Sequence, residues 1–145
     1  MDDRATSVQI GYTLSLAITA VLISGVLITA GGVVDSRQEQ TVRSELTVVG
    51  ERIAADLMTA DRLATAGGSE VRVDVSLPAR VAGASYRVTV DTSASPPRLV
   101  LTSDDPSVTV TVAFDSTTAV DAGTIAGGDL RIVLTPSDTL EVRST

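Results

Sequence analysis

The chain opens with a long uncharged segment. Residues 5–34 contain no Asp, Glu, Lys or Arg, and their apolar residues are densest between Leu14 and Ala30. A helix of this length extends for about 45 Å, whereas the hydrocarbon core of a bilayer is only ~30 Å thick. The segment therefore predicts a helix that inserts into a membrane or packs against other apolar helices. The side chains expected to make these contacts are Leu14, Leu16, Ile18, Val21, Leu22, Ile23, Val26, Leu27 and Ile28.

From Asp35 the pattern becomes amphipathic. Seven apolar residues recur at steps of three and four, and on a helix they fall within an arc of about 80°. Gly67 and Gly68 form a helix stop. The pattern predicts one nearly continuous helix from about Ser7 to Ala66, weakest at Gly31-Gly32 because glycine is a poor helix former. The seven residues, which we expect to pack on a sheet, are Val42, Leu46, Val49, Ile53, Leu57, Ala60 and Ala64.

After Gly68 the apolar period changes from 3.6 to 2, which is typical of strands with one buried face. Turn residues separate the alternating runs, and the short connections predict an antiparallel meander of about six strands. The fold class is therefore α+β, with the amphipathic helix covering the apolar face of the sheet. The expected organisation is a leader at 1–5, a hydrophobic transmembrane or assembly helix at 6–34, an amphipathic helix at 35–67 and an antiparallel β-sheet domain at 68–145.

The composition excludes several kinds of chemistry. The chain lacks His, Cys and Lys, so it has no imidazole base, thiol nucleophile, Schiff-base amine or ordinary zinc site. We therefore expect no enzyme activity and no cofactor. Its net charge of −7 argues against binding to nucleic acid. The acidic residues Asp104, Asp105, Asp121 and Asp129 are calcium candidates, but their spacing matches no EF-hand loop, and a solvated acidic surface is expected.

The charged residues also suggest an environment. All eleven basic residues are Arg, eighteen residues are acidic, and the apolar positions are rich in Ala, Val and Thr. This usage resembles that of proteins from salt-loving archaea. In molar salt the Debye length is about 3 Å, so a net charge of −7 repels itself little.

Three interpretations of the first thirty residues are open. The first is a secretory signal peptide that is cleaved near Thr29-Ala30-Gly31, although the segment is longer than the usual 7–15-residue apolar region. The second is a plain membrane anchor, with Tyr12 at an interface. The third is a filament-type segment, which is inserted in the membrane first and is later buried against identical helices.

The amino-terminal residues resemble the type IV pilins and pilin-like proteins, especially those of haloarchaea. The resemblance rests on the short charged leader Asp2-Asp3-Arg4-Ala5, on the apolar helix that follows it, and on the continuation into an amphipathic helix and a sheet. It implies that a prepilin-peptidase-like enzyme cuts between Ala5 and Thr6, after a small residue preceded by Arg4. It also implies a structural subunit or minor pilin of a cell-surface filament that associates with itself or with other pilin-like subunits.

The resemblance further implies a β domain on the outer side of the cell membrane. A second, sparser apolar strip of the amphipathic helix, formed by Val48, Ala55 and Met58, is a candidate contact with a neighbouring subunit. The alternative is a membrane-anchored extracytoplasmic binding module that does not polymerise.

Overall fold

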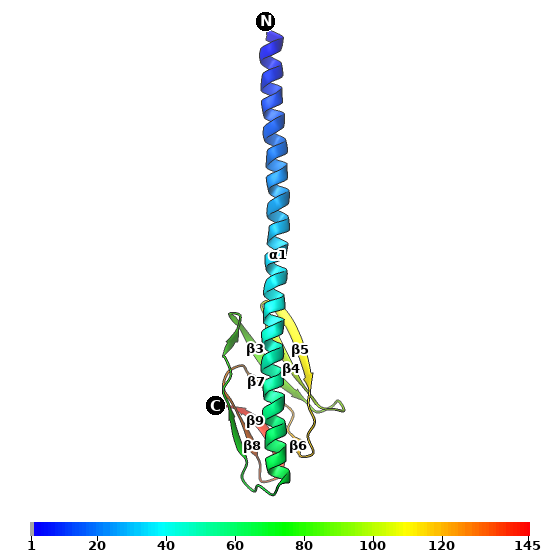
Figure 1. Ribbon diagram of the computed structural model, residues 1–145, viewed down its shortest axis with the longest axis vertical. Helices are drawn as coiled ribbons and strands as arrows, with labels where there is room; N and C mark the ends of the chain where they lie inside the picture. Colours follow the sequence, from blue (N-terminus) through cyan, green and yellow to red (C-terminus); the bar gives the residue numbers. More distant parts are fainter. Residues whose placement is uncertain (1) are drawn as a thin grey trace. The chain divides into compact units, whose positions relative to one another are not determined.

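The computed structural model describes the backbone of residues 2–145, and the side chains of residues 10–29 and 31–145. The chain forms one helix, α1 (Asp2–Thr65), followed by nine strands. The α+β class is confirmed, because α1 packs against antiparallel sheets (Figure 1). The helix begins at Asp2 rather than near Ser7, and Met1 lies outside the described residues. The chain divides into two compact units, Met1–Arg37 and Gln38–Thr145.

The strands form two sheets. One sheet has the order β1-β8-β9-β6, and the other has the order β2-β3-β4-β5, with β7 also paired to β3. The strands are β1 (Arg72–Val75), β2 (Arg80–Val81), β3 (Ala84–Asp91), β4 (Arg98–Asp104), β5 (Ser107–Ala113), β6 (Ala119–Val120), β7 (Gly123–Ala126), β8 (Leu130–Leu134) and β9 (Thr139–Ser144).

The expected meander of about six strands is wrong. Six of the nine strands lie on the alternating runs of the sequence, while β2, β6 and β7 are additional. Strand β1 pairs with β8 rather than with its sequence neighbour, β3 pairs with β7, and β6 runs parallel to β9. Strands β2 and β6 have only two residues each, and β7 (Gly-Thr-Ile-Ala) has no apolar alternation, so the period gives no sign of them.

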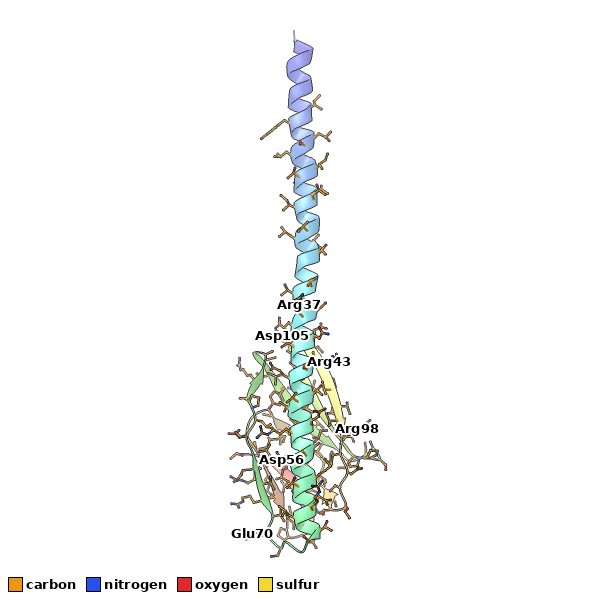
Figure 2. All side chains as sticks on the ribbon, viewed as in Figure 1. Arg37, Arg43, Asp56, Glu70, Arg98 and Asp105 are labelled. Carbon is orange, nitrogen blue, oxygen red and sulfur yellow. The ribbon has the colours of Figure 1, made fainter. Side chains whose placement is uncertain are left out.

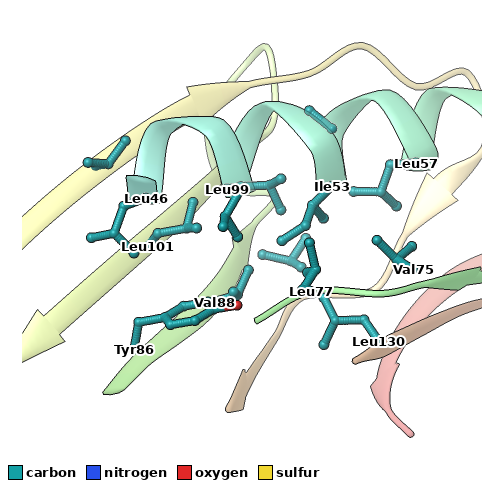
Figure 3. Close-up of a cluster of buried hydrophobic side chains, with 14 of the residues drawn as sticks. Leu46, Ile53, Leu57, Val75, Leu77, Tyr86, Val88, Leu99, Leu101 and Leu130 are labelled. Carbon is teal, nitrogen blue, oxygen red and sulfur yellow. The ribbon is translucent and has the colours of Figure 1, made fainter. Parts of the chain in front are cut away.

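The core lies between the second half of α1 and the inner faces of the sheets. Leu46, Ile53 and Leu57 of α1 pack with Leu99 and Leu101 of β4 in one cluster of buried side chains (Figure 3). Strand β3 supplies every second residue to the same cluster, as the period of 2 requires. Burying one such aliphatic side chain contributes about 1.5–3 kcal/mol, so this cluster is the main source of stability for residues 38–145.

Three glycines fix how α1 packs and ends. A Cβ at Gly50 would lie 2.8 Å from Cγ2 of Val112 and 2.9 Å from Cδ1 of Leu101, so only glycine lets the helix backbone approach the sheet here. At the end of α1, Gly67 has a φ of 92° and the N–H of Gly68 bonds the carbonyl of Leu63 at 3.1 Å. This is the Schellman arrangement, which satisfies the last carbonyls of the helix.

Candidate membrane and assembly surface

Residues 10–29 and 31–34 of α1 expose an apolar surface. All nine apolar residues that the sequence assigns to the membrane or assembly helix are exposed in the single chain, and Ile28 reaches 78%. Figure 2 shows their side chains projecting from the helix. The structure adds four large residues to this surface: Ile10, Tyr12, Val33 and Val34.

Four hydroxyl groups of this part of α1 are satisfied within the helix. Thr19, Ser24, Thr29 and Ser36 each donate a hydrogen bond to the carbonyl four residues earlier, at 2.8–2.9 Å. Internal bonds of this kind suit lipid, where every unsatisfied polar group is costly. Among the described residues, α1 is the one helix long and apolar enough to cross a membrane, by length and composition.

The expected processing site lies at the start of α1. The backbone of Arg4, Ala5 and Thr6 is helical. Their side chains lie outside the described part of the structure. The cut between Ala5 and Thr6 stays a prediction.

The amphipathic half of α1 lies with its apolar stripe toward the sheets. Six residues of the stripe are buried in the core: Val42, Leu46, Val49, Ile53, Leu57 and Ala60. The seventh, Ala64, is partly buried against the same cluster. The apolar stripe that the sequence pattern predicts is therefore the side of the helix that the sheets cover.

The three candidate contact residues do not share one site. Val48 is 62% exposed, Ala55 is exposed and Met58 is half-buried. Val48 borders a hollow of about 290 Å³ between α1 and the chain around β2; we call it the Val48 hollow, and its lining includes Glu45, Val48, Arg52, Leu77, Pro78 and Val81. Met58 borders a separate hollow.

The rim of the Val48 hollow is held by a contact that the sequence pattern did not reveal. The carboxylate of Glu45 accepts a hydrogen bond of 2.6 Å from the backbone N–H of Ala82. Ala82 lies in the two-residue turn between β2 and β3 and has a φ of 46°, which is uncommon for a residue with a Cβ. Glu45 thus joins α1 to this turn, although it sits on the polar side of the helix pattern.

The second hollow, of about 640 Å³, contains a buried acid that sequence analysis missed. We call it the Asp61 hollow; its lining includes Met58, Asp61, Arg62, Pro96, Asp115 and Ser116. Asp61 is buried, and its carboxylate accepts hydrogen bonds from the backbone N–H of Thr117 at 3.1 Å and of Thr118 at 2.7 Å. The signal for it in the sequence is that Asp61 directly follows Ala60, a residue of the apolar stripe.

The charge of Asp61 is stabilised by these contacts. Burial raises the pKa of its carboxyl, but hydrogen bonds from Thr118, Thr117 and Ser116 lower that pKa by more, so the net shift is downward. The carboxylate therefore stays ionised and ties α1 to the loop between β5 and β6.

The acidic loop residues lie at different places. Asp104 pairs with Arg87 at 3.0 Å, while Asp129 accepts hydrogen bonds from the hydroxyl of Ser76 and the N–H of Leu77, both at 3.0 Å. Within the described part of the chain, no group of three or more acidic side chains is arranged to hold a metal ion. Asp105 and Asp121 are exposed.

Over residues 1–144 the chain matches the model of a family described as "Family of unknown function (DUF7266)", and it belongs to that family. No curated protein and no solved structure matches it.

Proposed function

We propose that this chain is a non-catalytic structural subunit, or minor pilin, of an archaeal type IV pilus-like surface filament. In this proposal α1 inserts in the cell membrane, and the β domain lies on its outer side. One observation carries the proposal: residues 10–34 of α1 present an exposed apolar surface without a charge, and the same helix continues into the core of a folded domain.

The size of this surface argues that it is covered in the working protein. Thirteen large apolar side chains between Ile10 and Val34 are exposed. They are 49–78% exposed, so at about 1.5–3 kcal/mol for the full burial of each, covering them is worth on the order of 10–25 kcal/mol. A surface left in water would forgo this gain. Lipid can cover the surface before assembly, and neighbouring copies of α1 can cover it in a filament.

The resemblance to pilins supplies the route between these two states. Removal of the leader after Ala5 would leave a mature chain that begins with its apolar helix. Such a helix can move from lipid into a bundle of identical helices without exposing its surface to water. A heterologous contact between identical subunits that does not close into a ring gives an open helical filament.

A second candidate function is favoured by the Asp61 hollow. Its volume of about 640 Å³ lies within the ~300–1,000 Å³ range of small-molecule sites. In this alternative α1 is only an anchor, and the β domain is an extracytoplasmic binding module that does not polymerise.

The test is mass spectrometry of the amino terminus, in native membranes and in material sheared from the cell surface. A terminus at Thr6 in the sheared fraction supports the filament subunit. Uncut Met1 found only in membranes supports the anchor. A terminus near Gly31 contradicts both, because it would mean a secreted protein that has lost the apolar segment.

A matched pair of variants sharpens this test. The Ala5→Leu variant replaces the small residue before the expected cut and should retain the full leader. The Val8→Leu variant places the same leucine side chain beyond the cut and should be processed normally. If Ala5→Leu is processed as efficiently as Val8→Leu, the leader assignment is wrong.

A further inference from the structure

We propose that the Val48 hollow receives residues 28–35 of α1 from a second copy of this chain. The inference rests on the proposed function, since it names the surface through which subunits would contact one another. It assigns to the β domain and the second half of α1 a direct part in assembly.

The Val48 hollow is a marked exception to the burial pattern of its unit. Among the described residues of 38–145, only Val48 and Leu63 are large apolar side chains that remain exposed. Around the hollow, Val49, Leu77 and Val81 are buried, so an apolar wall is already in place. A side chain from another molecule that enters here contacts apolar side chains that the fold already holds in place.

The rim of the Val48 hollow carries one basic side chain that can pair with an acid of another molecule. The carboxylate of Glu45 is engaged by the N–H of Ala82, as described above. Arg52 forms no ion pair with any residue in the described part of the chain. An acid of the partner would therefore find a guanidinium beside the apolar wall.

The exposed half of α1 offers a matching set of groups. Asp35 is the first acid after the uncharged segment, and it lies seven residues after Ile28 and four after Gly31. On the hollow side, Arg52 lies seven residues after Glu45 and four after Val48. Both triplets therefore follow a single helix face with the same spacing.

Two parallel helices that place Asp35 beside Arg52 are displaced by 17 residues, or about 26 Å. This displacement brings Gly31 level with Val48. A parallel arrangement is the one available to copies that insert in a membrane in the same direction.

The shapes of the two surfaces agree with this displacement. Gly31 and Gly32 have no side chain, and a Cβ at either would meet open space, so the helix backbone is accessible there. Val48 is exposed on its own helix and can pack against this backbone, since glycines let two helices approach closely. One turn away, Ile28 is then placed to enter the hollow beside Val81, and the hollow of about 290 Å³ has room for a branched side chain.

Disulfide cross-linking in membranes and sheared material tests the contact, because the natural chain contains no cysteine. A chain with both Gly31→Cys and Val48→Cys cannot close a disulfide on itself, because residues 17 positions apart on one helix are about 26 Å apart and a disulfide needs Cα atoms within about 7 Å. If Gly31 of one copy contacts Val48 of the next, oxidation gives a ladder of covalent oligomers. Each single variant can give dimers at most.

The matched control combines Gly31→Cys with Thr47→Cys. Position 47 is adjacent to Val48 but is rotated by about 100° round the helix, and it does not line the Val48 hollow. We expect at least a tenfold lower yield of trimers and larger species from the control. Equal ladders from both pairs would overturn the proposal.

Charge exchange gives a second, independent readout. Arg52→Asp and Asp35→Arg should each lower the amount of assembled protein by about fivefold, the factor that corresponds to about 1 kcal/mol for an exposed ion pair. The double exchange should restore assembly.

The two hypotheses fail in different ways. If the wild-type chain assembles but the Gly31–Val48 ladder is absent and the double exchange restores nothing, the hollow receives something else and only this inference is overturned. If the chain is found only as single copies, the filament function fails and the inference fails with it.

Discussion

The Glu45 carboxylate on α1 accepts a hydrogen bond from the backbone N–H of Ala82, a residue held at positive φ in the turn that joins β2 and β3. The bond is 2.6 Å long and charge-assisted. Both turn residues, Ala82 and Gly83, have positive φ, which is the geometry of a two-residue type I′ hairpin turn. Glu45 of the helix thus stabilises a turn whose positive φ is unfavourable for the alanine at position 82.

Replacing Ala82 with glycine should therefore stabilise the protein. A left-handed conformation costs a residue with a Cβ about 1–2 kcal/mol, and removing the Cβ abolishes this cost. Glycine also has more conformational freedom in the unfolded chain, which offsets part of the gain. The backbone N–H that donates to Glu45 is retained. We expect the free energy of unfolding to rise by about 0.5–1 kcal/mol, as measured by thermal unfolding of the full chain in detergent, followed by circular dichroism.

The neighbouring residue supplies the control. Gly83 has a φ of 83°, so Gly83→Ala places a Cβ on a backbone that disfavours it. This variant should lower the free energy of unfolding by about 1–2 kcal/mol. Opposite signs for the two variants support the turn geometry, whereas a loss of stability in Ala82→Gly would contradict it.

The Asp61→Asn variant should be less stable at neutral pH by about 2 kcal/mol, because hydrogen bonds to a charged acceptor contribute about 1.5–3 kcal/mol. Asp61 has a lowered pKa in the folded protein, so its carboxylate stabilises the fold fully above its unfolded pKa of about 3.8. That contribution is lost as the pH falls through the lower, folded value.

The difference between the wild type and Asp61→Asn should therefore shrink as the pH falls below about 3.8. Unfolding curves measured across this range test the sign. Asp115→Asn is the control, because Asp115 is an exposed acid in the lining of the same hollow, and it should change stability by less than about 0.5 kcal/mol. A constant difference at all pH values would mean that the charge of Asp61 is not responsible.

Local periodicity explains how much of the fold the sequence could predict. The stripe from Val42 to Ala64 and the alternation in β3 and β4 follow from helix and strand geometry, and both could be recognised without the structure. Strand order could not be recognised in this way. Nothing in the residues of β1 distinguishes β8 from β3 as its partner, because pairing depends on the packing of all the strands together.

The candidate sites also divide into features that the sequence predicts and features that depend on the folded arrangement. The exposed apolar surface of residues 10–34 follows from composition alone. The Val48 hollow does not, because it forms where α1 meets Leu77, Pro78 and Val81, which are distant in sequence. The contacts of Glu45 and Asp61 also join α1 to turns 37 and 56 residues away, and no local pattern encodes such pairs.

Ser103→Ala should stabilise the protein. The Ser103 side chain is fully buried in β4, and its hydroxyl has no hydrogen-bond partner in the described part of the chain. An unsatisfied buried polar group costs about 1–3 kcal/mol, although the loss of a few atoms from the core offsets part of the gain. We expect the free energy of unfolding to rise by up to about 1 kcal/mol. A decrease of more than 1 kcal/mol would show that the hydroxyl is satisfied in solution.

Gly50→Ala should destabilise the protein even though alanine is the better helix former. On helix propensity alone the change would stabilise α1 by about 1 kcal/mol. The new Cβ would instead lie within 3 Å of Val112 and Leu101, and such overpacking costs about 1–3 kcal/mol. Gly11→Ala is the matched control on the same helix, because a Cβ at that position would have no atom within 4 Å. We expect the melting temperature of the β domain in detergent to fall in Gly50→Ala and to stay unchanged in Gly11→Ala. If Gly50→Ala is as stable as the wild type, the helix and β5 are further apart than the structure places them.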